Sequence, residues 1–387
     1  MKIAIIGGAV ANKYLNGGAV WTRINWALGI RKLGFKVYFL EQIERAHCVD
    51  SSGAVTTFEN CRNRVFFKKV MKDAGLQDTS ALIYANGEQI DGMTRQDLEN
   101  LAENADLLIN ITGHLRLPLF MNAHVCKVYI DLDPGFTQFW HLAGMLDAQF
   151  ARHDHFFTIG EAIGTPACAI PTAGIGWHIT RQPVVLEHWP VTLSDKPDRF
   201  TTVACWRDTY GPVEYRGKTY GLKLHQFRRF IELPESIPQI CEIALDIHPD
   251  ERGDLELLHR HGWVITDPVI QVPDPDKFRE YVQDSGAEFS VAKGIYTDTN
   301  SGWFSDRTVR YLASGKPALV QDTGFSKVYP VGEGLLAFTT MEEAIAGAQN
   351  ISRNYREHCR SARLLAETWF DSDKVLGDLV ETIDISP

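Results

Sequence analysis

The chain alternates short apolar strands with helices, and it does so in two successive series. Residues 2–6 form an apolar run without polar alternation, which is typical of a strand covered on both faces, as in a parallel sheet. After Gly7-Gly8 and a long polar turn, apolar residues recur at helical spacing between Trp21 and Leu33, and a strand is predicted over 36–40. This strand–helix–strand unit favours an α/β fold.

A second series begins at Phe200. Its predicted strands cover residues 200–205, 242–247, 263–266, 288–292 and 318–321. Residues 174–197, just before it, are rich in Pro, Gly, Trp and His, and the prolines disfavour a helix there. The length of 387 residues also exceeds the usual domain size of about 100–200 residues. We therefore predict two Rossmann-like, doubly wound domains, over residues 1–190 and 198–365, that enclose a cleft.

One edge of the first domain is predicted to bind ligands. In open α/β sheets, ligands bind beyond the carboxyl ends of the strands. Residues 7–18, Gly113-His114 and residues 131–135 each follow a predicted strand. We expect these three segments to share one rim of the sheet.

Composition and charge limit the classes of function. The net charge of -10 argues against broad nucleic-acid binding, which needs clustered Lys and Arg. No stretch approaches the roughly 20 apolar residues of a membrane span. The apolar run in residues 1–7 reaches a turn too soon to form the apolar segment of a signal peptide. The seven cysteines lie far apart, without metal-ligand or redox spacing. We expect a cytoplasmic protein without a transmembrane segment.

The segment 300–317 has the clearest signature of a ligand site. Ser305 is a natural N-cap, and Val309, Leu312 and Ala313 fit one face of the helix that follows. The unpaired N–H groups and the positive dipole end of such a helix suit a diphosphate. The alternative is an ordinary capped helix.

Two glycine-containing turns follow this helix. Residues 322–326 come directly after the strand 318–321, and their glycine lets a ligand approach the backbone closely. Asp322 and Thr323 offer hydrogen bonds suited to sugar hydroxyls. In the next turn, Glu333 stands between two glycines before an apolar strand.

The run from 290 to 343 resembles the donor-binding half of GT-B glycosyltransferases, in the branch related to spore-maturation-type and group-1 enzymes. The family has a Phe-Ser-Asp-Arg-like stretch and an Ala-Ser-Gly-Lys-Pro-like helix end, which appear here at 304–307 and 313–317. Residues 362–370 resemble the last helices of the family. The resemblance implies a GT-B architecture with a C-terminal helix, in residues 366–387, that crosses back to the first domain.

The resemblance also implies an activity and a set of site residues. It implies a hexosyltransferase-like enzyme that moves a sugar from a nucleotide-diphosphate sugar to a hydroxyl-bearing acceptor. The donor-binding residues that it implies are Ser305, Asp306, Arg307, Thr323, Gly324 and Glu333. Arg207, just past the strand 200–206, adds a candidate phosphate contact, because a guanidinium stabilises a leaving diphosphate without a metal. Gly17 and Gly18 resemble the acceptor-side glycine loop, and Trp21 is a candidate for stacking on the acceptor.

The first domain supplies the candidate catalytic groups. An inverting reaction needs a base that takes the proton of the acceptor, and His114, Asp131 and Asp133 follow strands on the predicted rim. Of these, Asp133 and His114 are the predicted catalytic residues. Retaining relatives often carry two glutamates eight positions apart, and Asp298 and Asp306 occupy that offset here, so the stereochemical course stays open.

Two other classes of function fit parts of the pattern. In an NAD(P)-dependent oxidoreductase, residues 2–7 would be the dinucleotide-binding strand and Glu41 the ribose acid, but the glycines do not follow G-x-G-x-x-G. A non-catalytic nucleotide-sugar binding protein would need the same cleft but no titratable group.

No cofactor and no metal ion are expected. Asp131-Leu132-Asp133 matches the Asp-x-Asp pattern of a metal site, but it lies on the predicted acceptor side. The expected acceptor is a small molecule, a saccharide or a lipid-linked intermediate, with nucleic acid less favoured.

Overall fold

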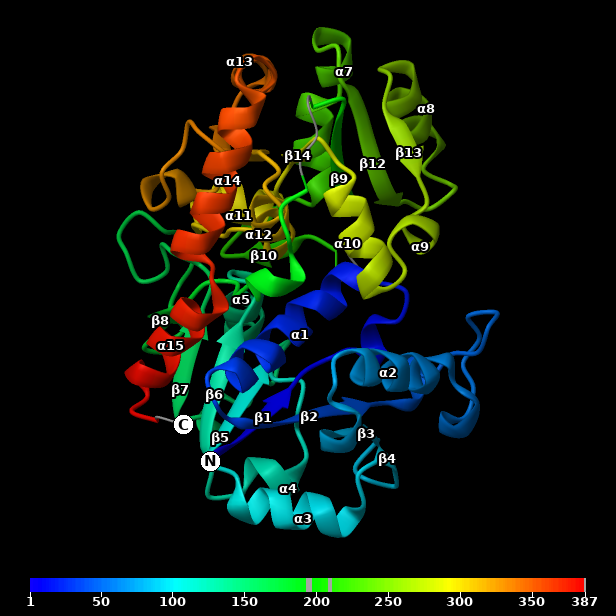
Figure 1. Cartoon of the computed structure of the whole chain (residues 1–387), viewed down its shortest axis with the longest axis vertical. Coiled ribbons are helices and arrows are strands. Elements are labelled where there is room, and N and C mark those ends of the chain that lie inside the picture. Colours follow the sequence, from blue (N-terminus) through cyan, green and yellow to red (C-terminus); the bar gives the residue numbers. More distant parts are fainter. Residues whose placement is uncertain (193–196, 208–210, 386–387) are drawn as a thin grey trace.

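The computed structural model describes residues 1–192, 197–207 and 211–385, which form two α/β domains stacked along the longest axis of the molecule (Figure 1). In the described part of the first domain, eight strands form a sheet of order β4-β3-β2-β1-β5-β6-β7-β8, in which only β4 is antiparallel to its neighbour. The strands are β1 (Ile3–Gly7), β2 (Lys36–Ile43), β3 (Ser80–Tyr84), β4 (Gln89–Gly92), β5 (Leu107–Ile111), β6 (Cys126–Asp131), β7 (His155–Thr158) and β8 (His178–Ile179).

Helices cover both faces of this sheet because the central strands are apolar on both sides. In β1, Ala4 and Ile6 join the core formed with α1, whereas Ile5 joins a separate core with α3 and α4. All three side chains are fully buried. The helices are α1 (Gly17–Lys32), α2 (Arg62–Asp73), α3 (Arg95–Asn104), α4 (Pro118–Met121) and α5 (Phe136–Leu142).

The second domain has an entirely parallel sheet, of order β13-β12-β9-β14-β15-β16 in the residues described. Its strands are β9 (Arg199–Cys205), β12 (Ile240–Asp246), β13 (Val264–Thr266), β14 (Ala287–Ser290), β15 (Ala318–Gln321) and β16 (Leu335–Phe338). Its helices are α6 (Lys223–Phe227), α7 (Leu233–Ser236), α8 (Arg252–Arg260), α9 (Pro268–Gln271), α10 (Pro275–Gln283), α11 (Gly294–Asp298), α12 (Asp306–Ala313), α13 (Met341–Arg353) and α14 (Tyr355–Trp369).

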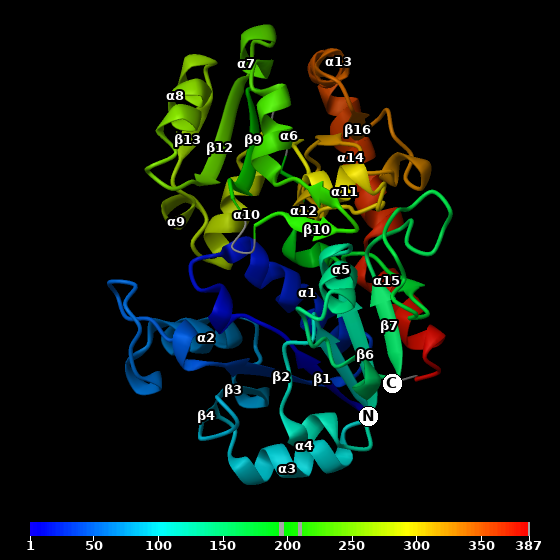
Figure 2. The same cartoon turned by 180° about the vertical axis from the view of Figure 1, so that it is seen from behind.

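A hairpin of the second domain reaches the first. Strands β10 (Val213–Tyr215) and β11 (Lys218–Tyr220) lie outside both main sheets. Tyr220 stacks on Phe139 of α5, with ring centroids 5.1 Å apart and planes 16° apart, and Tyr215 lies 4.7 Å from the same ring. This aromatic contact connects the two domains, and Figure 2 shows β10 beside α5.

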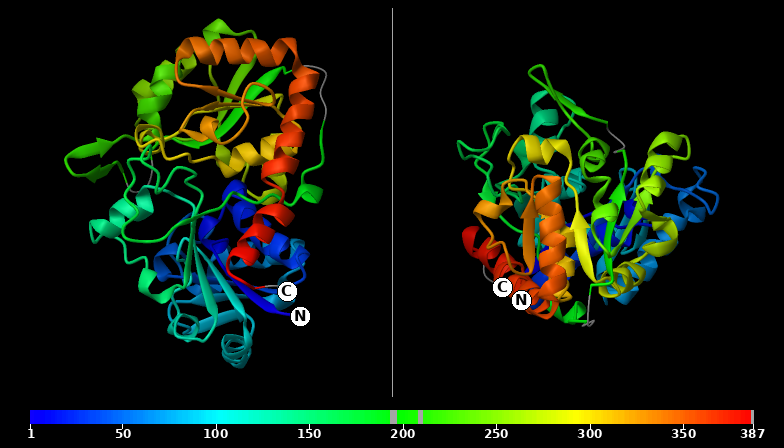
Figure 3. Two further views of the ribbon diagram at one scale, coloured as in Figure 1. Left: turned by 90° about the vertical axis from the view of Figure 1, so that its left-hand side faces the viewer. Right: turned by 90° about the horizontal axis from the view of Figure 1, so that it is seen from above.

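The end of the chain returns to the first domain. Helix α14 runs down from the second domain, and α15 (Ser372–Thr382) packs on α1, where Leu376 lies against Gly29 (Figure 3). Asp371 pairs with Val184 as an isolated bridge between the two helices. The return therefore occurs at residues 370–371, since residues 366–369 still belong to α14.

This architecture confirms the predicted class of two doubly wound α/β domains. The structure also has elements that the sequence analysis did not predict. Among these are α2, the strands β3 and β4 and the β10–β11 hairpin.

Candidate functional site

A cavity of about 570 Å³ lies between the two domains, at the carboxyl ends of β9 and β12. It lies where the start of α1 meets α10 and α12, as Figures 1 and 2 let the reader follow. Arg23 and Asp133 line it from the first domain. From the second domain, its charged lining residues are Asp246, Asp306 and Arg307. Among its neutral lining residues are Asn16, Gly18, Thr22, Gln182, Cys205 and Trp303.

The amino end of α12 faces this cavity. Ser305 caps the helix, because its hydroxyl accepts a hydrogen bond of 3.3 Å from the backbone N–H of Arg307. Ser305 itself is buried, while Trp303, Asp306 and Arg307 line the cavity. The positive end of the helix dipole therefore points at the space between the domains.

Arg307 is held rigidly at the edge of the cavity. Its Nε donates to Glu288 at 2.6 Å, and its two other nitrogens donate to the carbonyl of Val203 at 2.9 Å and to the hydroxyl of Ser290 at 2.6 Å. Burial alone would lower the pKa of Arg307, but Glu288 outweighs it and the pKa is raised. The guanidinium stays charged and fixed.

Asp306 connects the two domains. Its carboxylate accepts hydrogen bonds from Thr22 of α1 at 2.7 Å and from Arg310 at 2.8 Å. Arg310 also donates to the carbonyl of Gly18 at 3.0 Å and to the Thr22 hydroxyl at 2.9 Å. Burial alone would raise the pKa of Asp306, but Arg310 outweighs it and the pKa is lowered.

Asp133 is the exposed carboxylate of the first domain at this cavity. It follows β6, and its Oδ1 accepts a hydrogen bond of 3.1 Å from the hydroxyl of Tyr296 in the second domain. Asp131, two residues earlier, is fully buried and accepts hydrogen bonds from Thr137, Gln138 and Thr158. Burial raises the pKa of Asp131. Asp131 therefore maintains the structure of the rim, and Asp133 alone of the two faces the cavity.

His114, the other predicted catalytic residue, is not among the residues that line the cavity. It is partly buried near Arg23 and Lys13. Burial, together with the charges of these two residues, lowers the pKa of His114 to about 3. The imidazole is neutral at physiological pH, and such a low pKa makes it a poor general base.

Arg23 is a residue of the site that the sequence analysis missed. It lies in the second turn of α1, is only 9% exposed and lines the cavity. Residues 17–30 of α1 carry no other charged side chain, and most of them are buried. A lone arginine in a helix that is buried on every side needs an acceptor, and this signal was present in the sequence.

Arg207 and Glu333 lie outside the cavity. Arg207 pairs with Glu251 on the surface of the second domain, at the end of β9. Glu333 is exposed and accepts a hydrogen bond of 3.3 Å from Ser361 of α14. The structure does not bring these two predicted donor contacts to the start of α12.

The turn at Thr323 and Gly324 packs behind the cavity. The hydroxyl of Thr323 donates to the carbonyl of Trp303 at 2.6 Å, and the backbone N–H of Gly302 donates to the carbonyl of Thr323 at 2.8 Å. Gly324 lies directly against the side chain of Asn300 and has φ +99°. These contacts support the segment that precedes α12.

The predicted acceptor residues of α1 mainly pack against the second domain. A Cβ on Gly17 would lie 2.0 Å from the carbonyl oxygen of Asp274, and one on Gly18 would meet the ring of Phe278. Trp21 donates to the carbonyl of Pro275 at 2.7 Å and lies outside the cavity lining. Of the three, Gly18 lines the cavity. Asp298 is exposed at the end of α11, apart from Asp306.

Glu41 blocks the dinucleotide site of the oxidoreductase alternative. Its carboxylate accepts hydrogen bonds of 2.6–2.7 Å from the backbone N–H groups of Val10, Ala11 and Asn12, in the turn after β1. A dinucleotide would place its pyrophosphate on such N–H groups. Burial raises the pKa of Glu41 to about 7, against the effect of these bonds. The geometry therefore argues against this alternative.

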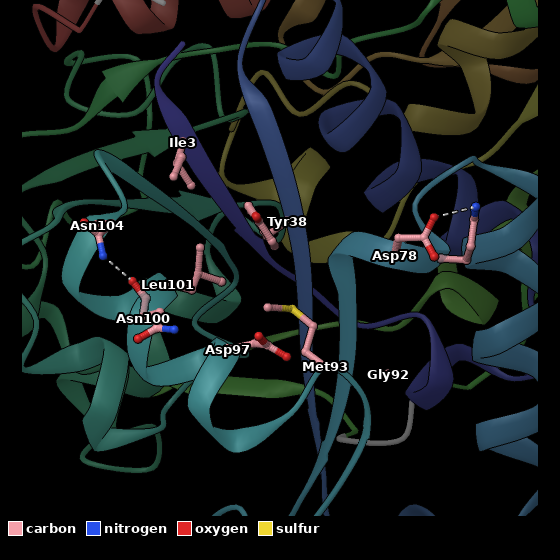
Figure 4. A pocket seen from close by; sticks show the side chains of 10 residues that line it. Ile3, Tyr38, Asp78, Gly92, Met93, Asp97, Asn100, Leu101 and Asn104 are labelled. Atoms are coloured by element: carbon pink, nitrogen blue, oxygen red, sulfur yellow. Dashed lines mark hydrogen bonds between the residues drawn. The ribbon is translucent and has the colours of Figure 1, made fainter.

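A second cavity, of about 520 Å³, lies beside β2, β4 and α3 near the start of β1 (Figure 4). Its polar side chains are engaged within the first domain: Asp97 caps α3 through Thr94, and Asn104 donates to the carbonyl of Asn100 at 2.8 Å. It lies at the amino end of β1, away from the edge at which such sheets bind ligands.

Neither a known protein family nor a curated protein matches the chain by its sequence. Solved structures match it over its whole length. An alpha-glucosyltransferase in complex with UDP and a 13-mer DNA has 12% identity and a TM-score of 0.60, covering 100% of both chains. HepE of Anabaena in complex with UDP-glucose has 13% identity and a TM-score of 0.61, covering 99% of both. The fold is that of the GT-B glycosyltransferases. Sucrose-phosphate synthase from Thermosynechococcus elongatus also matches, with 12% identity, a TM-score of 0.54 and 99% coverage of both chains.

Two further findings concern the described residues as a whole. They contain no helix with the length and apolar character of a membrane span. They also contain no cluster of three or more His, Cys, Asp or Glu side chains that is placed to hold a metal ion.

Proposed function

We propose that the chain is a glycosyltransferase that uses a nucleotide-diphosphate sugar, with UDP-sugars as the first candidates. The observation that carries this proposal is the cavity between the domains, where a carboxylate of one domain faces the capped start of α12 in the other. UDP and UDP-glucose are bound in structures of the same fold, which supports this class of donor.

The two sides of the cavity have complementary chemistry. The start of α12 and the Arg307 guanidinium provide positive potential for a diphosphate leaving group. Asp133 provides a carboxylate on the opposite side that takes the proton of an acceptor hydroxyl. Because His114 is not among the residues that line the cavity, Asp133 is the stronger candidate for the base.

The proposed reaction is a single displacement. The bond between the anomeric carbon and the diphosphate oxygen breaks, and its electron pair leaves with the nucleoside diphosphate. The acceptor oxygen bonds to the anomeric carbon, and its proton passes to Asp133. This course inverts the anomeric centre, and NMR of the glycoside product tests it.

We propose that this reaction needs no metal ion, because the charge of the leaving group is met by guanidinium and helix-dipole charge. Activity that survives EDTA supports this part. Activity that is lost in EDTA and restored by Mn²⁺ contradicts it.

A donor screen tests the function directly. The purified chain is incubated with UDP-, GDP- and TDP-sugars and pooled acceptors, and mass spectrometry detects the nucleoside diphosphate and the new glycoside. Asp133→Asn should lower the rate about 100-fold or more, whereas Asp250→Asn, whose side chain is 81% exposed, should match the parent chain. Saturable donor binding without release of nucleoside diphosphate would favour the non-catalytic binding protein.

The acceptor is proposed to be a hydroxyl-bearing small molecule, saccharide or lipid-linked intermediate. The net charge of -10 disfavours a polyanionic acceptor. Because a protein of the same fold is seen with DNA, the screen includes duplex DNA as one acceptor. Transfer to DNA would overturn this part of the proposal.

A further inference from the structure

Arg23 occupies a position in the cavity that its own structural role does not explain. It comes from α1 of the first domain, and Arg307 lines the same cavity from the second domain. Its side chain passes Gly8, where a Cβ would lie 3.2 Å from its Cγ, and reaches the cavity lined by Asp133 and Asp306. A buried arginine at such a place normally donates most of its N–H groups to acceptors.

Arg23 uses little of its donor capacity inside the protein. One nitrogen, Nη1, donates to the carbonyl of Ala19 at 3.0 Å. The Nε atom is buried without a hydrogen-bond partner. In the part of the chain that the structure describes, Arg23 forms no ion pair, unlike Arg307 and Arg310.

The carboxylates near Arg23 are already engaged. Glu41 accepts the backbone N–H groups after β1, and Asp306 accepts from Thr22 and Arg310. Asp133 accepts from Tyr296. Burial lowers the pKa of Arg23, and the charges of Asp306, Asp133 and Glu41, which act at longer range, oppose this effect without outweighing it.

We infer that Arg23 binds the diphosphate of the nucleotide-sugar donor, so that the leaving group is held by a guanidinium from each domain. The inference rests on the proposed function. It adds that the first domain also contributes positive charge to the binding of the donor diphosphate. A phosphate anion fits better than a neutral hydroxyl, because only an anion compensates an unpaired buried guanidinium.

The test compares ligands that differ in their phosphates. Isothermal titration measures the binding of UDP, UMP, uridine and inorganic pyrophosphate to the parent chain, Arg23→Gln and Arg23→Lys. Arg31→Gln is the matched control, since Arg31 is an exposed residue of the same helix and donates to the carbonyls of Ala74 and Gly75. Circular dichroism and thermal unfolding establish that each variant is folded.

The expected result is a loss of UDP affinity of about tenfold to hundredfold in Arg23→Gln, with uridine binding unchanged. Arg23→Lys keeps the charge and should recover part of the loss, and it serves as the readout if Arg23→Gln does not fold. Equal losses for UDP and uridine, or no loss for either, would overturn the assignment of Arg23. If the parent chain binds none of UDP, GDP and TDP and releases none of them from a sugar donor, the proposed function fails instead.

Discussion

The hydroxyl of Tyr296 donates a hydrogen bond of 3.1 Å to Oδ1 of Asp133, although the two residues lie 163 positions apart and in different domains. The ring of Tyr296 is itself fixed, because it stacks on Trp303 with centroids 4.3 Å apart and planes 10° apart. The candidate base of the first domain is therefore oriented by the segment that leads into α12.

Tyr296→Phe should lower kcat about tenfold with little change in the KM of the donor, because the ring still stacks while the hydrogen bond to the Asp133 carboxylate is lost. Steady-state kinetics measures both constants. Tyr215→Phe is the control, since Tyr215 also packs its ring across the domains but contacts Phe139 outside the cavity. A rise in KM without a fall in kcat would contradict a role of Tyr296 in orienting Asp133.

The stability of the protein should depend on the Asp306–Arg310 pair, because loss of the carboxylate leaves the buried guanidinium unpaired. The side chain of Arg310 is 2% exposed and that of Asp306 is 28% exposed. Asp306→Leu leaves a buried guanidinium without its counter-ion, which costs about 3–5 kcal/mol in the free energy of unfolding. The double variant Asp306→Leu, Arg310→Met should regain part of this loss, as urea denaturation can show. A double variant less stable than Asp306→Leu would mean that the pair contributes mainly through Arg310.

His114 should make stability depend on pH. Its pKa is lowered from the usual value near 6.5 to about 3, so the unfolded chain binds the proton more readily than the folded one. The contribution of His114 to the free energy of unfolding is therefore fully present above pH 6.5 and is lost as the pH drops toward 3. His114→Asn should reduce the loss between pH 7 and pH 5 by about 1–2 kcal/mol. Urea denaturation at both values tests this, with the exposed His248→Asn as the control that should keep the full loss.

Sequence reasoning found features that depend on neighbours along the chain. The N-cap at Ser305 and the start of α12 follow from local spacing and capping chemistry. The hairpin between β10 and β11 was missed although its signal was local: Arg216-Gly217 is a two-residue loop with φ +49° and +76°, as a type I′ turn requires.

The contacts of the site could not be read in this way, because they join distant segments. Thr22 and Asp306 form a hydrogen bond although 284 positions separate them. Glu41 accepts hydrogen bonds from a turn that lies about 30 residues before it in the chain. The family resemblance placed Thr323 and Glu333 at the donor, and the structure adds their hydrogen bonds to Trp303 and Ser361, which lie 20 and 28 positions away. Arg23 likewise lies beside Gly8, which comes from a different element of the first domain, and lines the cavity together with residues of the second domain.

Gly17 provides the strictest test of how the domains fit together. Its backbone N–H donates to the carbonyl of Val272 at 3.0 Å, and a Cβ at this position would lie 2.0 Å from the carbonyl oxygen of Asp274. That oxygen belongs to the backbone and cannot rotate away, so Gly17→Ala must push α10 from α1.

We expect Gly17→Ala to lower the free energy of unfolding by about 1–3 kcal/mol, as overpacking does, and to weaken UDP binding, because the cavity lies between these two helices. Gly253→Ala is the matched control: it also sits in a helix, α8, and a Cβ there would meet nothing within 4 Å. The control should be neutral or up to about 1 kcal/mol more stable. Equal stability and equal UDP affinity in both variants would show that the close packing of α1 on α10 does not shape the cavity.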